Sequence, residues 1–127
     1  MRSEPHDAVF AWAATQPQDQ LYTTSITKAE ILYGIAALPH GRRRAALQVR
    51  ANAMFVEEFA DKIAPFDAAA AEIYAEIVVR RQRSGRPIDI LDAQIAAIAA
   101  IFGGEIATRN VDDFADCGLA IINPWGA

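Results

Sequence analysis

The sequence has almost no cysteine, no long apolar run and no excess of positive charge. The one cysteine, Cys117, excludes an internal disulfide framework and suits a reducing cytoplasm. No apolar run approaches the ~20 residues of a membrane-spanning helix, and residues 1–4 do not resemble a signal peptide. The formal net charge of −4 means that the chain as a whole is not a basic nucleic-acid binder. A polyanion such as RNA or DNA would have to bind to a local positively charged patch or to a metal ion.

The residues that are present predict one α/β domain over residues 1–127. Hydrophobic residues make up 53% of the chain, enough for an ordinary core. Helical periodicity predicts helices at about 6–14, 27–38, 43–59, 68–83 and 90–102, and a short helix from Val111. Strands are expected in "LYTTS", "KIAPF", "EIAT" and "LAIIN". Strands that alternate with helices indicate a parallel sheet covered on both faces.

The helical spacing also predicts which side chains point inward. The expected core residues are Ile31, Ile35, Leu38, Leu47, Ala51, Met54, Phe59, Ile73, Tyr74, Ile77, Leu91, Ile95, Ile98 and Phe102.

One arrangement of polar residues occurs three times: a capping residue stands three positions before an acid. The three segments are Thr27–Glu30, Asp89–Asp92 and Asn110–Asp113. A capping residue followed by an acid at the third helical position is a helix N-terminus signature. The acid also suits the positive end of the helix dipole, an interaction of typically 0.3–1 kcal/mol. For any one segment alone, capping is the stronger interpretation.

Three such segments together favour a second interpretation. Glu30 and Asp113 follow apolar strands, and the carboxyl ends of parallel strands line the edge of a sheet where ligands bind. Asp92 joins them if its helix packs beside that edge. Carboxylates crowded together repel one another unless a cation joins them, and oxygen ligands without a nearby histidine suit Mg²⁺ or Mn²⁺. Such ions orient and activate water against a phosphodiester, and helix N-termini can hold phosphate oxygens.

Three longer motifs carry a family resemblance. "SITKAEILYGIAALPHGRRR", "RPIDILDAQIAAIAAIFGGEIATRNVDDF" and the terminal "INPW" resemble the PIN-domain family, above all the VapC-type and FitB-type toxins of bacterial toxin–antitoxin pairs. The resemblance covers essentially the whole chain. It implies a three-layer fold with a short parallel sheet between helices, and a Mg²⁺- or Mn²⁺-dependent endoribonuclease. It also implies a homodimer that a small antitoxin, encoded beside it, inhibits.

The resemblance assigns roles to individual residues. Glu30, Asp92 and Asp113 match the family's metal-binding catalytic acids. Thr108 and Asn110 would be polar neighbours that orient the metal or its waters. Under the same resemblance Asp89 is a helix cap, and Asp112 is a solvated neighbour of Asp113.

The start of the chain departs from the family pattern. PIN domains begin with a central hydrophobic strand that ends in a metal-binding aspartate, typically "L-D-T-N". This chain opens at "MRSEPHDAVFAWA", which resembles the segment after that strand in the family, and no residue matches the aspartate. We therefore expect an N-terminally incomplete PIN-like domain of uncertain activity. It would arise from a start codon placed too late or from truncation; the alternative is a degenerate relative that has lost catalysis.

Other features have ordinary interpretations. The runs Arg42–Arg44 and Arg80–Arg81, with Arg83 and Arg86, are expected on solvated helix faces; contact with RNA or an acidic partner is the minority interpretation. Cys117 is expected to be a small buried filler. Two other functions stay open: a non-catalytic module that dimerises and binds an antitoxin, and a nuclease that acts on DNA. The RNA target, the cleavage sequence and the antitoxin leave no readable motif.

Overall fold

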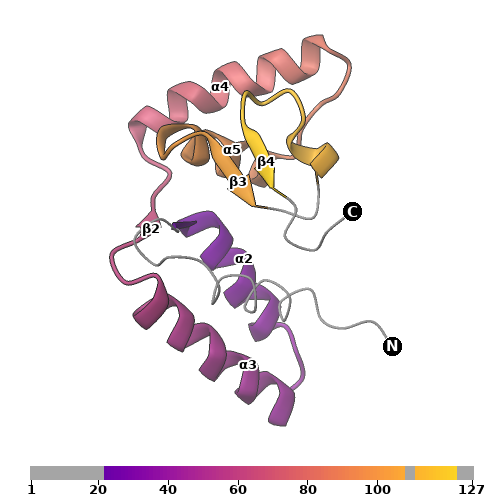
Figure 1. Ribbon diagram of the computed structural model, residues 1–127. Coiled ribbons are helices and arrows are strands. Elements are labelled where there is room, and N and C mark those ends of the chain that lie inside the picture. The colour runs from indigo at the N-terminus through magenta and orange to yellow at the C-terminus, as the bar shows by residue number, and fades with distance from the viewer. Residues whose placement is uncertain (1–21, 108–110, 123–127) are drawn as a thin grey trace. The chain divides into compact units, whose positions relative to one another are not determined.

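The computed structural model describes residues 22–107 and 111–122, and the chain divides into two compact units. The first unit comprises residues Met1–Ala64 and the second Pro65–Ala127. Figure 1 shows the helices and strands of both units. In the part of the chain that the structure describes, no helix is long and apolar enough to cross a membrane. The helix predicted at 6–14 and the terminal "INPW" from residue 123 on lie outside the described residues.

Over its described residues, 22–64, the first unit contains two helices, a π-helical turn and a pair of short parallel strands. In chain order they are β1 (Thr23–Thr24), α2 (Ser25–Ala36), α3 (Arg42–Ala53), the turn η2 (Met54–Glu58) and β2 (Ile63–Ala64). The ladder places Thr23 opposite Ile63 and Thr24 opposite Ala64. The strands predicted in "LYTTS" and "KIAPF" are therefore confirmed, although each is only two residues long. Pro65 directly follows β2, where it removes no ladder donor.

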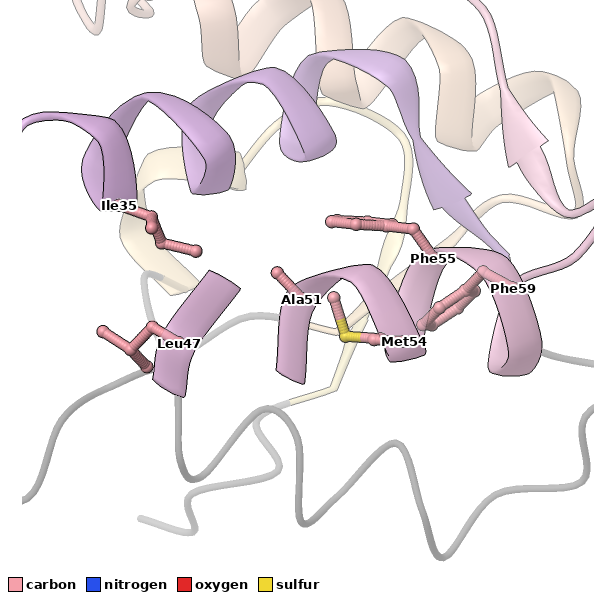
Figure 2. Packing of buried hydrophobic residues seen from close by; sticks show 6 residues of the cluster. All are labelled: Ile35, Leu47, Ala51, Met54, Phe55 and Phe59. Atoms are coloured by element: carbon pink, nitrogen blue, oxygen red, sulfur yellow. The ribbon is translucent and has the colours of Figure 1, made fainter. Parts of the chain in front are cut away.

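The core of the first unit joins α2 to α3 and η2. Figure 2 shows its six buried side chains: Ile35, Leu47, Ala51, Met54, Phe55 and Phe59. Five of the six are predicted from helical spacing, and burial of each large apolar side chain contributes about 1.5–3 kcal/mol. The sixth, Phe55, is reached from α2 by the Lys28 Nζ, which lies 5.5 Å from the centre of its ring. The predicted helix at 43–59 widens at its end, where the Phe59 N–H donates to the Met54 carbonyl at 2.9 Å.

Where the structure describes it, at residues 65–107 and 111–122, the second unit contains two long helices, a 3₁₀ turn and a second pair of parallel strands. They are α4 (Ala68–Arg83), α5 (Ile90–Ile101), β3 (Glu105–Ala107), the turn η3 (Val111–Phe114) and β4 (Ala120–Ile122). The β3–β4 ladder pairs Glu105 with Ala120 and Ala107 with Ile122. The predicted helix 68–83 agrees with α4 at both ends. Asp67 caps it, because one carboxylate oxygen accepts the Ala70 N–H at 2.9 Å.

The inward face predicted for α5 is partly wrong. Ile98 is buried as predicted, but Leu91 and Phe102 are 40% and 46% exposed. The fully buried positions are instead the small residues Ala93, Ala96 and Ala97. Since α5 is apolar around most of its circumference, hydropathy does not choose a face. Close approach to α4, which α5 contacts, favours the alanine face.

The α/β class with parallel strands and flanking helices is confirmed by both units. Within the described residues each ladder has two strands: β1 with β2, and β3 with β4. In the first unit α2 and α3 lie between the paired strands in the sequence, and α2 contacts β1; in the second unit η3 lies between the paired strands, and α5 contacts β3. Both ladders are therefore closed by helical crossovers or turns, as parallel pairing requires.

Candidate active site

Glu30 lies inside α2 and not at its start. The cap of α2 is Thr24, whose hydroxyl oxygen accepts the Thr27 N–H at 2.9 Å. The same hydroxyl donates to Thr27 Oγ1 at 2.9 Å. The prediction that Thr27 caps the helix is therefore wrong. The segment "TTSIT" offers several hydroxyls, and the cap goes to the one that still has extended backbone, at φ −116° and ψ 155°.

This correction changes the meaning of Glu30. Counted from Ser25, Glu30 is the sixth residue of α2, and its side chain is exposed. The interaction of an acid with the helix dipole falls off within the first turn of about 3.6 residues. The helix start therefore does not account for Glu30, and its role as a metal ligand stays a prediction.

Asp92 does lie at a true helix start. The carboxylate of Asp89 accepts the N–H groups of Leu91 and Asp92 at 3.1 and 3.4 Å. The prediction that Asp89 is a cap is thus confirmed, and α5 begins at Ile90. Asp92 is its third residue, and the side chain is half-buried. The helix dipole favours a negative charge at this position, whether or not a cation is also bound.

Asp113 lies on the 3₁₀ turn η3. Its side chain and that of Asp112 are exposed, which agrees with the solvated position predicted for Asp112. The next residue, Phe114, is only 4% exposed and ties the turn to the core of the second unit. Thr108 and Asn110, the predicted polar neighbours, lie outside the described residues, so their roles stay predictions.

Sequence reasoning missed the importance of Arg81. Its side chain is 4% exposed, so the expectation that this arginine lies on a solvated face is wrong. Nη1 donates to the carbonyls of Asp113 and Ala115 at 2.8 and 2.9 Å, and Nε donates to the Arg86 carbonyl. Helical spacing could have indicated this burial, because Arg81 follows the buried Ile77 by four residues on α4.

Two neighbouring arginines contact the same segment from outside. The Arg80 guanidinium lies 3.5 Å from the Asp116 carbonyl, and that of Arg86 lies 3.5 Å from the Asp112 carbonyl. Arg86 also forms an exposed ion pair with the Asp116 carboxylate at 3.6 Å. Such exposed contacts contribute little. The expectation of exposed arginines thus holds for Arg80 and Arg86, although both also reach the segment that follows η3.

Cys117 completes the environment of Arg81. It is a free thiol, 4% exposed, so the prediction of a buried filler is confirmed. Its Sγ lies 3.7 Å from Arg81 Nη1 and 3.6 Å from the Ala115 carbonyl. The turn that carries Asp113 is thus held by the burial of apolar side chains and by the hydrogen bonds of the guanidinium.

The structure brings two of the predicted site elements together. In the second unit η3, with Asp113, packs against α5, at whose start Asp92 lies, and against β4. Glu30 belongs to the first unit. In residues 22–107 and 111–122, no three His, Cys, Asp or Glu side chains are grouped as a metal site. The predicted ligands are all carboxylates, a donor set that fits Mg²⁺ or Mn²⁺ and not a soft metal.

Comparison with known proteins identifies the family. Residues 1–118 match the PIN domain. The chain is 40% identical to "VapC ribonuclease Y4jK" of Sinorhizobium fredii (strain NBRC 101917 / NGR234), over 98% of this chain and 89% of that protein. It is 34% identical to "Toxin FitB" of Neisseria gonorrhoeae (strain ATCC 700825 / FA 1090), over 98% of this chain and 90% of that protein.

Solved structures agree with these relatives. The crystal structure of FitAcB from Neisseria gonorrhoeae superposes with a TM-score of 0.85 at 33% identity, covering 99% of this chain and 91% of that one. VapBC-5 from Mycobacterium tuberculosis, a member of the VapBC family of toxin–antitoxin systems, gives a TM-score of 0.70 at 29% identity, over 83% of this chain and 82% of that one. The match over residues 1–118 and these relatives confirm the resemblance seen in the sequence, and the chain belongs to the PIN-domain family.

Proposed function

We propose that the chain is the toxin of a toxin–antitoxin pair and hydrolyses RNA phosphodiester bonds with the help of Mg²⁺ or Mn²⁺. The observation that carries the proposal is the set Glu30, Asp92 and Asp113 within a PIN domain whose relatives include a protein named as a ribonuclease. Glu30 is the sixth residue of α2, beyond the first turn in which the helix dipole favours an acid.

In the proposed site the carboxylates of Glu30, Asp92 and Asp113 would hold the ion as oxygen ligands, and Thr108 and Asn110 would orient it or its waters. A bound divalent ion would supply positive charge against the transition state and polarise the phosphate oxygens. Asp92 lies in the first turn of α5, and the cap Asp89 fixes the backbone of that turn. Hydrolysis of this kind leaves 5′-phosphate and 3′-hydroxyl ends.

The partners follow from the same family. Structures similar to this chain are complexes named FitAcB and VapBC, which supports a small antitoxin as the inhibitory partner. We place the protein in the cytoplasm, where Cys117 stays reduced.

An RNA cleavage assay tests the proposed function. The chain should cut a structured RNA with Mg²⁺ or Mn²⁺, stop when EDTA is added, and lose activity on Asp113→Asn. A folded chain that binds an antitoxin but neither binds Mn²⁺ nor cuts RNA would instead be the non-catalytic module. Preferential cutting of single-stranded DNA of the same sequence would replace RNA with DNA as the substrate.

A further inference from the structure

Arg81 has an environment that its place on α4 alone does not require. The guanidinium is buried in the second unit, where its described hydrogen bonds go to three backbone carbonyls and one sulfur. Two of the carbonyls belong to Asp113 and Ala115, which lie 32 and 34 positions further along the chain. Arg81 therefore joins the last turn of one long helix to the turn that carries a proposed metal ligand.

Burying an arginine costs more free energy than burying an apolar side chain of similar size. The guanidinium keeps its charge at all ordinary pH values, and burial of a charge is unfavourable unless its donors are bonded. Replacing a whole buried ion pair by apolar side chains of similar size is often neutral for stability, so a buried charge is weak evidence for a role in stability alone. Arginine also makes directional hydrogen bonds, because its planar fork of N–H groups holds several acceptors in one fixed geometry.

The segment that receives these hydrogen bonds is a short turn together with the loop that follows it. The turn η3 spans only Val111–Phe114, and the Ala115 N–H reaches the Asp112 carbonyl at a long 3.4 Å. Beyond it, Asp116 has a left-handed backbone at φ 59°. Phe114 and Cys117 anchor the segment because both side chains are buried. Burial of apolar groups is non-directional, so it does not by itself fix the orientation of the Asp113 backbone. The bond of 2.8 Å from Arg81 to the Asp113 carbonyl sets the register at the residue whose carboxylate is exposed.

We propose that Arg81 is the positioning residue for Asp113: it fixes the main chain of η3 so that the Asp113 carboxylate is presented to the divalent ion. This inference rests on the proposed function of the same site. Groups that orient a metal ligand typically change metal affinity or activity by 10- to 100-fold when they are removed. Arg81 is not itself placed in contact with substrate or metal.

The test compares Arg81→Met, Arg81→Lys and the matched control Arg80→Met. Methionine keeps the length of the stem and removes the donors. Lysine keeps the charge but lacks the planar fork of N–H groups that donates to the carbonyls of Arg86, Asp113 and Ala115. Arg80 is the neighbouring exposed arginine, whose contact of 3.5 Å goes to Asp116 and not to Asp113. Each protein is measured by thermal unfolding, by calorimetric titration with Mn²⁺, and by kcat and KM for RNA cleavage.

We expect Arg81→Met to fold and to bind Mn²⁺ about 10- to 100-fold more weakly, with the loss of cleavage mainly in kcat. Arg81→Lys should show a smaller loss in the same direction, and Arg80→Met should match the unaltered chain. A purely structural role would lower the melting temperature but leave the Mn²⁺ affinity of the folded protein unchanged.

Three results would overturn the inference, and they differ from one another. If the unaltered chain binds Mn²⁺ and cleaves RNA, and folded Arg81 variants bind Mn²⁺ as well as Arg80→Met does, the positioning role alone is wrong. If neither Arg81 variant folds, the arginine serves folding and not the site. If the unaltered chain neither binds Mn²⁺ nor cleaves RNA, the proposed function fails first and the role of Arg81 with it.

Discussion

The segments Thr27–Glu30 and Asp89–Asp92 have the same arrangement of residues but different structures. In the second unit Asp89 caps α5 and Asp92 occupies the third helical position. In the first unit the cap is Thr24, and Glu30 falls a turn and a half into α2. A capping residue three positions before an acid therefore need not mark a helix start. Where it does not, neither capping nor the helix dipole accounts for the acid, and the role of Glu30 as a metal ligand stays a prediction.

The largest expected effect is on catalysis, where the two acids should behave alike despite their different structures. Glu30→Gln and Asp92→Asn should each lower RNA cleavage by roughly 100-fold or more, because loss of a ligand costs at least as much as loss of a group that orients one. Single-turnover cleavage with saturating Mg²⁺ measures this. If Glu30→Gln cleaves normally while Asp92→Asn does not, the two acids do not share a site.

A smaller effect should separate the true caps from the apparent one. Thr24→Ala and Asp89→Ala should each lower the free energy of unfolding by about 0.5–2 kcal/mol, because each leaves helix N–H groups unbonded. Thr27→Ala should cost less than Thr24→Ala, since its N–H remains and Thr24 still accepts it. Urea unfolding of the three variants checks the order. Equal losses at Thr24 and Thr27 would contradict the assignment of the cap.

The smallest effect should distinguish the two acids by stability alone. Asp92→Asn in the metal-free protein removes a charge from the first turn of α5, which should cost about 0.3–1 kcal/mol at low salt unless relief of repulsion offsets it. Glu30→Gln lies beyond the first turn of α2 and should stay within about 0.5 kcal/mol of the unaltered chain. Unfolding in 10 mM and 500 mM salt (~30 Å and ~4 Å Debye lengths) separates the charge effect. If Glu30→Gln lowers the free energy of unfolding more than Asp92→Asn does, the difference inferred between the two helix starts is wrong.

Much of the fold is predictable because the apolar residues of many segments recur with a clear helical spacing. The bounds of α4 are predicted at both ends, since an apolar face begins after the cap Asp67 and ends before Gly85. The core of the first unit is predicted for the same reason, apart from Phe55. The face of α5 is not, because "ILDAQIAAIAAI" is apolar on nearly every side and close packing against α4 selects its alanines.

The candidate site is only partly predictable, for a physical reason that the arginines illustrate. A sequence shows that Arg81 is charged but not that distant carbonyls compensate its burial. The choice among Thr24, Ser25 and Thr27 as the cap depends on where β1 ends, which hydropathy does not resolve. Asp89, by contrast, is recognisable as a cap because it follows Pro87 and precedes a long apolar helix.

The most direct test of the proposed metal site is calorimetric titration of Mn²⁺ into the unaltered chain and into Glu30→Gln, Asp92→Asn and Asp113→Asn. If the three carboxylates share one ion, the unaltered chain should bind Mn²⁺ and each variant should bind it far more weakly, although only Asp92 lies at the start of a long helix. Equal binding heats in all four proteins, or no binding in any of them, would contradict the shared site.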